Sequence, residues 1–269
     1  MKKQLPIGLV VEGNSTNSAV LRLPNLPEEI GPIKSTALRV ARRFSNFLRA
    51  GYAVSTYEQL QASRLVLIHV PDCAVPRVVD ELCRSELQLR TMACVFCETW
   101  LMTDSLSQLT QRGASVATVI TVPSGWHRWF ILEGHAPVVR QVRRLLDDNN
   151  ARALELRPGS KSLYFAAQLL ATTLPIPLLT AAQHALRDAG ISGNHLHTLL
   201  EEMSQKMFKD FSKGSRVPWG GPLNDCSRAI ADGHFAALRQ THPDLAALIE
   251  QQLHLPDSRG KCTSGIHGD

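Results

Sequence analysis

The sequence is poor in the features that mark fibrous, disulfide-bonded or nucleic-acid-binding proteins. Its 269 residues include 6 cysteines, too few for the disulfide network of a small secreted domain. Basic residues exceed acidic ones by only 29 to 24, and aromatic residues make up 6%. Such a weak charge excess does not indicate a nucleic-acid partner. With 44% apolar and 20% charged residues, the chain is expected to fold around a core, with its cysteines reduced.

Two apolar segments raise the question of a signal peptide or a membrane span. Leu5–Val11 follows two lysines, but it contains a proline and ends at Glu12 without a small-residue cleavage site. Ser162–Leu186 has no charged residue, yet it contains Gln, Thr and His side chains and two central prolines, Pro175 and Pro177. We expect a helix enclosed by protein, and a soluble, cytoplasmic chain with no membrane partner.

The first 157 residues alternate short apolar runs with amphipathic ones. Strands are expected at 6–11, 29–33, 52–55, 64–70, 92–96, 115–121 and 130–132, and helices at 37–50, 75–87, 105–112 and 136–146. Strands separated by helices form a parallel sheet that is covered on both faces. This pattern predicts an α/β fold, with residues 1–157 as a Rossmann-like domain of the dinucleotide-binding type.

The strand pattern ends at the turn formed by residues 157–159. Four helices are expected after it, at 161–189, 195–211, 225–239 and 243–253, the first interrupted at its prolines. Residues 158–255 are therefore predicted to form an all-α domain. The composition of residues 256–269 is that of a disordered tail.

The first predicted strand leads into Gly13, Asn14, Ser15 and Thr16. In dinucleotide-binding domains this turn reads G-x-G-x-x-G, because glycines let the backbone approach the pyrophosphate at a helix N-terminus. Here one glycine of the three remains, and Glu12 adds a negative charge that is expected to repel phosphate. The polar side chains could donate hydrogen bonds to phosphate, or the segment could be an ordinary capped turn.

The residues after the second predicted strand bear on the choice of cofactor. An acidic residue there binds the ribose of NAD, whereas a basic one accommodates the 2′-phosphate of NADP. This chain has Lys34, Ser35 and Thr36, followed by Arg39. NADP is therefore the expected cofactor, held by Ser35 and Arg39 together with the turn at 13–16. Alternatively, the arginines form the solvated face of an amphipathic helix.

Cysteine and histidine spacing gives no metal site. Cys94 and Cys97 match C-x-x-C, but on a strand residues three apart point to opposite faces, so a shared metal or a disulfide is not expected. His195 and His197 have no carboxylate or cysteine at metal-ligand spacing.

Several segments, in order, resemble one known superfamily. Residues 66–72 (VLIHVPD) are similar to the fourth strand of the 6-phosphogluconate-dehydrogenase-like superfamily, and 161–164 (KSLY) to the start of its helical domain in one branch. Residues 219–223 (WGGPL) and 234–238 (HFAAL) resemble that branch's "TGPIxRGD…HLxAL" signature. The branch comprises Rossmann-like proteins with a C-terminal helical domain of unknown function. It is related to pyrroline-5-carboxylate reductase and to deazaflavin-dependent NADP oxidoreductases.

The resemblance implies an oxidoreductase that binds NAD(P) between its domains and pairs as a homodimer through its helical domain. Hydride would pass between the nicotinamide and a small carbonyl, imine or hydroxyl substrate. Pro71 and Asp72 would shape the loop above the fourth strand. Lys161 would be the acid or base, and His234 is the other catalytic residue that the resemblance retains.

Other motif positions differ from the family pattern. Its "HCSG" is Phe96-Cys97-Glu98-Thr99 here, and no residue of its "RGD" remains at 225–227. The alternative is therefore a non-catalytic Rossmann-fold dimer, a scaffold or binding module that has lost the dinucleotide site. For Lys161 alone, the alternative is a solvated lysine in the first turn of a helix.

Overall fold

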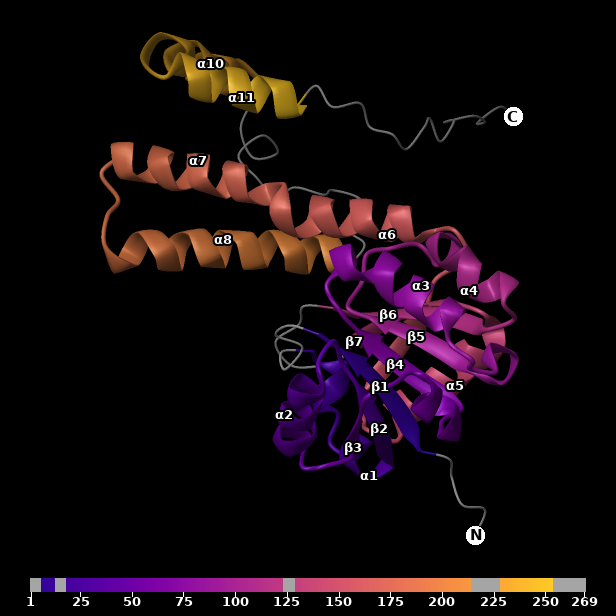
Figure 1. Cartoon of the computed structure of the whole chain (residues 1–269). Helices are drawn as coiled ribbons and strands as arrows, with labels where there is room; N and C mark the ends of the chain where they lie inside the picture. Colours follow the sequence, from indigo (N-terminus) through magenta and orange to yellow (C-terminus); the bar gives the residue numbers. More distant parts are fainter. Residues whose placement is uncertain (1–5, 13–17, 123–128, 214–227, 254–269) are drawn as a thin grey trace, which may run out of the picture. The chain divides into compact units, whose positions relative to one another are not determined.

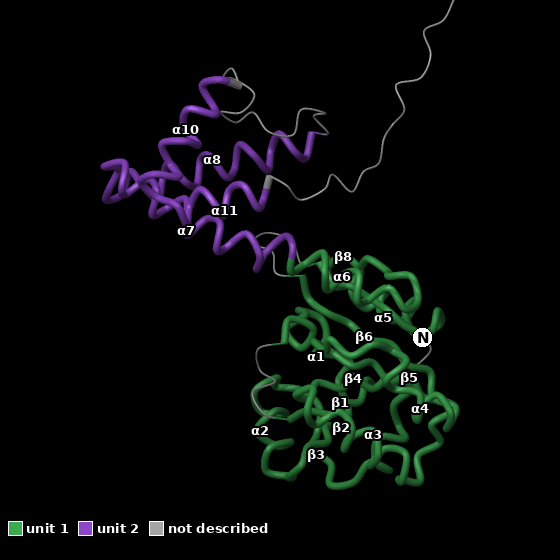
Figure 2. The backbone as a smooth tube through the Cα atoms, turned by 90° about the horizontal axis from the view of Figure 1, so that it is seen from above, with its two compact units in different colours: residues 1–169 green, residues 170–269 purple. Residues whose placement is uncertain are grey.

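A computed structural model describes residues 6–12, 18–122, 129–213 and 228–253. The chain divides into two compact units, residues 1–169 and 170–269 (Figure 2), and each is described by itself. The turn Gly13–Thr16 and the predicted tail at 256–269 lie outside the described residues. The domain boundary after residue 157 remains a prediction.

The first unit is built on an eight-stranded sheet with the order β3-β2-β1-β4-β5-β6-β7-β8 (Figure 1). Its strands are Ile7–Val11 (β1), Ile30–Lys34 (β2), Tyr52–Val54 (β3), Leu65–His69 (β4), Ala93–Cys97 (β5), Ser115–Val122 (β6), Trp129–Gly134 (β7) and Arg152–Glu155 (β8). The six strands from β1 to β6 are parallel and follow the Rossmann order. The predicted α/β fold is confirmed, and its topological switch point lies between β1 and β4.

The edge of the sheet differs from the predicted parallel arrangement. β7 runs antiparallel to β6, because only six residues separate Val122 from Trp129 and a parallel crossover needs a dozen or more. β8 pairs with β7 in parallel and was not predicted. Three of its four residues are exposed, so it lacks the apolar run that marks a buried strand.

Helices cover both faces of the sheet. The helices of this unit are Leu26–Glu29 (α1), Leu38–Leu48 (α2), Val75–Arg84 (α3), Ser107–Gln111 (α4), Ala136–Asp147 (α5) and Lys161–Gln168 (α6). One core lies between the sheet and α2 with α5, and the other between the sheet and α3 with α4. Successive strand residues alternate between the cores. Cys94 and Cys97 accordingly lie in different cores, as predicted.

The second unit is helical in its described residues. Its helices are Pro175–Asp188 (α7), Asn194–Ser212 (α8), Arg228–Thr241 (α10) and Pro243–Leu253 (α11), with α7 and α8 side by side (Figure 1). The predicted helix at 161–189 is α6, a π-helical turn at Leu169–Thr173 and then α7. The interruption directly precedes Pro175, whose nitrogen cannot donate a helical hydrogen bond.

The helix Lys161–Asp188 is long and apolar enough, by length and composition, to cross a membrane. Within the described residues, the most apolar stretch of this helix is not buried. The described part of this chain therefore does not enclose the helix as predicted.

Candidate active site

The carboxyl ends of β2 and β4 place the predicted cofactor-binding residues at one edge of the sheet. Ser35 follows β2, and its buried hydroxyl donates a hydrogen bond to the Val11 carbonyl at 2.6 Å. Pro71 and Asp72 follow β4 and are exposed. Because the single hydroxyl hydrogen of Ser35 is already donated within the protein, this side chain ties β2 to β1 and could only accept a further hydrogen bond.

The carboxylate of Glu12 is paired with a cation. Its Oε1 lies 2.5 Å from Nη2 of Arg77, whose Nη1 lies 2.8 Å from Oε1 of Glu81. The hydrogen bonds to Glu12 and then to Glu81 raise the pKa of Arg77 above its usual value, so it stays charged. Arg77 therefore compensates the charge that was predicted to repel phosphate.

Two cations border the end of β2. Lys34 donates through Nζ to the Ser35 carbonyl at 2.5 Å, and its Nζ lies 4.9 Å from the Tyr57 ring centroid. Burial lowers the pKa of Lys34, and Glu81 is the main charge that opposes this shift. Arg39 is exposed in the first turn of α2.

Glu98 connects the end of β5 to β6 and to Ser18, at the carboxyl ends of the strands. It follows β5 with a φ of 58°, and its carboxylate accepts hydrogen bonds from the Thr121 amide at 3.0 Å and the Thr121 hydroxyl at 2.5 Å. The hydroxyl of Ser18 lies 3.5 Å from it. Burial lowers the pKa of His69 at the end of β4, and the Glu98 charge opposes this shift. The sequence signal for Glu98 was a carboxylate directly after a buried strand.

Lys161 is fully buried at the start of α6, with 2% of its surface exposed. Its Nζ donates hydrogen bonds to the Leu101 carbonyl at 2.6 Å and the Thr118 hydroxyl at 2.9 Å. The interpretation as a solvated lysine is wrong. An ammonium carries three N–H donors, and within the described residues two have acceptors. A third hydrogen, or the lone pair of the neutral amine, is left for another molecule.

A chain of hydrogen bonds connects Lys161 to the loop after β4. The Thr99 hydroxyl donates to Oδ1 of Asp72 at 2.5 Å and accepts from the Leu101 amide at 3.1 Å. The Leu101 carbonyl in turn accepts from Lys161. The structure thus brings together Asp72 and Lys161, two predicted site residues that are far apart in the sequence.

Burial lowers the pKa of Lys161 from 10.5 to about 8, and the charges of Glu133 and then Asp72 oppose this shift. Glu133 is itself 2% exposed on β7. Its carboxylate accepts the Gly159 amide and the Thr103 hydroxyl, each at 3.1 Å. Glu133 therefore fixes the turn before α6 and supplies a negative charge to the lysine. Sequence reasoning missed this residue.

Lys161 lines a cavity of about 310 Å³ that lies wholly within the first unit. The other lining residues are mostly apolar: Trp100, Leu101, Met102, Ser105, Ser162 and Phe165. The Trp100 and Phe165 rings meet edge to face, with their centroids 5.2 Å apart. A single titratable amine in apolar surroundings suits proton transfer to a small, mainly apolar molecule.

The other predicted catalytic residue, His234, lies elsewhere in the chain. It is exposed on α10 in the second unit, whereas Lys161 belongs to the first. Neither unit by itself brings the two side chains together. A catalytic role for His234 remains a prediction.

Comparisons with known proteins agree with this architecture. A protein from Bacteroides fragilis, provisionally described as an NADP oxidoreductase, is 12% identical with a TM-score of 0.74 over 93% of this chain and 96% of its own. This chain has a 6-phosphogluconate-dehydrogenase-like fold. An imine reductase from Myxococcus stipitatus in complex with NADP+ is 14% identical, with a TM-score of 0.61 over 91% of this chain and 92% of its own. A pyrroline-5-carboxylate reductase from Coxiella burnetii is 14% identical, with a TM-score of 0.57 over 93% of this chain and 97% of its own.

The family comparison agrees with the predicted helical part. Residues 128–248 match the family model described as Domain of unknown function (DUF2520). No curated protein matches the sequence. The predicted resemblance is thus confirmed for the fold and for this domain.

Proposed function

We propose that this protein is an NADP-linked oxidoreductase that transfers a hydride between the nicotinamide and a small carbonyl, imine or hydroxyl substrate. The observation that carries the proposal is the buried Lys161 amine, which has a hydrogen or lone pair to spare beside an apolar cavity. Solved proteins of the same fold include reductases, one of them in complex with NADP+.

The residues at the carboxyl edge of the sheet fit a phosphorylated dinucleotide. Arg39 is exposed and has no ion pair within the described residues, and Lys34 lies at the end of the same strand. Both cations suit a 2′-phosphate, while the turn at 13–16 would hold the pyrophosphate beside the loop of Pro71 and Asp72. The cofactor would supply the hydride donor or acceptor, which no side chain provides.

Lys161 acts as the acid or base. As an ammonium it donates its third hydrogen to the oxygen or nitrogen of the substrate during reduction, while Leu101 and Thr118 hold the side chain in place. As a neutral amine it accepts that proton in the oxidative direction. With a pKa of about 8, both forms are populated near neutral pH. Glu133 is a positioning residue that favours the ammonium.

The cavity favours small substrates with an apolar or aromatic substituent. Trp100, Met102 and Phe165 supply apolar walls, and the only charged lining residue in the described chain is Lys161. The names of two relatives, imine reductase and pyrroline-5-carboxylate reductase, describe reduction of carbon–nitrogen double bonds. Imines and carbonyls of this size are the first substrates to test.

The active form is a homodimer in the cytoplasm, in which a second copy covers the apolar helices. Leu170 and Ile176 are 65% and 57% exposed, and Phe211 on α8 is 63% exposed. Apolar side chains grouped on neighbouring helices mark an interaction surface rather than a solvated one. A second copy would also give Lys161–Asp188 the enclosure that the described part of one chain does not provide.

Titration of the purified protein with NADPH, followed by nicotinamide fluorescence, tests the proposal. We expect saturable binding at micromolar NADPH and at least tenfold weaker binding of NADH. Arg39→Ala should remove most of that preference, whereas Arg43→Ala, which alters another exposed arginine of α2, should keep it. Absence of binding up to millimolar NADPH would reject the proposal and favour the non-catalytic scaffold.

A further inference from the structure

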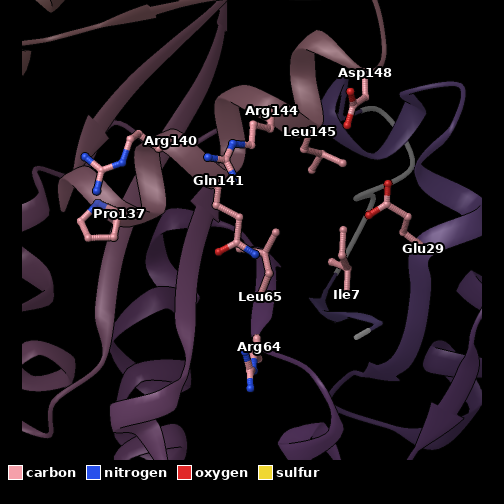
Figure 3. A pocket seen from close by; sticks show the side chains of 10 residues that line it. All are labelled: Ile7, Glu29, Arg64, Leu65, Pro137, Arg140, Gln141, Arg144, Leu145 and Asp148. Carbon is pink, nitrogen blue, oxygen red and sulfur yellow. The ribbon is translucent and has the colours of Figure 1, made fainter. Parts of the chain in front are cut away.

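A second cavity, of about 610 Å³, lies at the amino ends of β1 and β4 (Figure 3). Ile7 and Leu65, which line it, begin β1 and β4, whereas the cofactor-binding residues follow the carboxyl ends of these strands. It shares no lining residue with the cavity of Lys161. Its volume is within the range that holds small-molecule ligands. Nothing in the proposed oxidoreductase activity uses this cavity.

Charges of both signs line the cavity. The basic group is Arg140 and Arg144 of α5 with Arg64 before β4, and the acidic group is Glu29 and Asp148; Arg140 lies across the cavity from Glu29 (Figure 3). Within the described residues, none of the three arginines has an ion pair or a side-chain hydrogen bond. Leu65, Leu145 and Ile7 add apolar surface between the two groups.

Each group also holds like charges close together. Arg140 and Arg144 are four residues apart on one helix, a spacing that is unfavourable for two cations. Burial and the neighbouring Asp148 charge raise the pKa of Glu29. A ligand with an anion at one end and a cation at the other would relieve both repulsions.

The wall of the cavity is held in place before any ligand binds. The backbone amide of Asn25 donates to Oδ1 of Asn149 at 2.6 Å, and the Asn25 side chain donates to the Asp148 carbonyl at 2.7 Å. Asn149 in turn donates to the Leu145 carbonyl at 2.8 Å. These bonds attach the end of α5 to the segment before α1, so little ordering is required on binding.

We propose that this cavity binds a small zwitterion of the amino-acid class. Its carboxylate is held by Arg140 and Arg144, which can form charge-assisted hydrogen bonds with both oxygens. Its amine lies toward Glu29 and Asp148, and its aliphatic chain crosses Leu65 and Leu145. The cavity is a second small-molecule site, separate from the hydride-transfer site.

Calorimetric titration with 8-aminooctanoate, octanoate and octylamine tests the charge pattern. These probes have the same chain length and carry both end charges, the anion alone or the cation alone. We expect 8-aminooctanoate to bind at least tenfold more tightly than either single-charge probe. Equal binding of octanoate, or no binding of 8-aminooctanoate, overturns the proposal.

Variants then locate the binding. The double variant Arg140→Ala/Arg144→Ala should weaken 8-aminooctanoate at least tenfold. Asp148→Asn should weaken 8-aminooctanoate but leave octanoate unchanged. Arg43→Ala, far along the sequence on α2, is the matched control and should change nothing. All four side chains are exposed, so we expect the variants to fold. An unchanged affinity in the double variant overturns the assignment.

The two proposals are independent in these experiments. The arginine double variant should bind NADPH as the unmodified protein does, because the altered residues are at the amino edge of the sheet. A chain that binds no NADPH but still prefers 8-aminooctanoate retains this site and loses only the proposed oxidoreductase function.

Discussion

The two units bury their apolar residues to very different extents. In the first unit, Leu9 and Val11 on β1 are fully buried, and both faces of the sheet are covered by helices of the same chain. Among the described residues of the second unit, Leu196 and Ala246 are the only buried hydrophobic ones, whereas Leu170 and Phe211 are 65% and 63% exposed. The first unit completes its own core. The described helices of the second leave large apolar side chains exposed, which is the surface that we propose a second copy covers.

Substituting the catalytic candidate of each unit, Lys161 or His234, should give the largest difference in turnover. Lys161→Met removes the proposed proton donor and should lower turnover about 10²- to 10⁴-fold. His234→Gln alters an exposed side chain and should lower it less than tenfold. Steady-state kinetics with NADPH and a set of small imines and ketones measures both. A larger loss for His234 would move the chemistry into the second unit.

Lys161→Met should change the stability of the fold only modestly. The folded state lowers the pKa of Lys161, so burial of its ammonium disfavours folding below pH 8, and this cost is relieved as the pH rises from about 8 to 10.5. Removing the charge relieves this cost at pH 7, whereas the lost hydrogen bonds to Leu101 and Thr118 oppose the gain, so the two effects should partly cancel. Urea denaturation checks this point, and a marked loss of stability would mean that the kinetic effect is structural.

A matched pair of leucine truncations tests the difference in burial directly. Leu67→Ala on β4 removes a side chain that is 1% exposed and should cost about 2–5 kcal/mol of unfolding free energy. Leu170→Ala, at 65% exposure, should change the stability of the isolated chain by less than about 0.5 kcal/mol. Thermal denaturation of dilute protein is the measurement. Similar losses for both variants would contradict the difference described above.

Charged substitutions on the exposed apolar helices test whether these side chains form a dimer interface. Leu174→Glu/Ile176→Glu should shift the protein from dimer to monomer and raise the dimer dissociation constant at least about a hundredfold, because each carboxylate would be buried without a partner. Analytical ultracentrifugation measures the change. Asp188→Asn, which removes a charge at the end of the same helix, is the control. A monomeric unmodified protein, or one that requires detergent or lipid to stay dispersed, would reject the dimer.

The smallest expected effect is a shift in the pH profile. Glu133 raises the pKa of Lys161, so Glu133→Gln should move the alkaline limb of the reduction rate below pH 8 by about one pH unit. Reduction needs the ammonium, and its rate falls as the pH passes the pKa. The rate at pH 6 should change little. Glu28→Gln, an exposed carboxylate, should leave the profile unchanged.

Much of the sheet could be predicted because strands that are buried on both faces have continuous apolar sequences. Leu65–His69 shows this pattern, whereas Arg152–Glu155 at the edge does not and was missed. The orientation of β7 could have been inferred from its short connection. The exposure of α7 could not, because an apolar helix has the same composition whether its own chain or another surface covers it.

The site was predictable only in part. Family resemblance gave Lys161 and Asp72, and the end of the second predicted strand gave Ser35. The partners of Lys161 could not be predicted, because Leu101 contributes a backbone carbonyl and Thr118 lies inside a strand. The pairing of Glu12 with Arg77 likewise joins residues that no local pattern connects. Folding brings these groups together.

The π-helical turn has a practical consequence for dissecting the protein. It begins at Leu169, where the two compact units divide, so the first unit includes α6. A truncation after residue 157 would therefore remove Lys161, which packs against the sheet. The side chains of Thr118 and Glu133, which are buried in the whole chain, would then lose the cover that it provides. A fragment designed to contain the proposed active site should extend through residue 169, so that it includes α6.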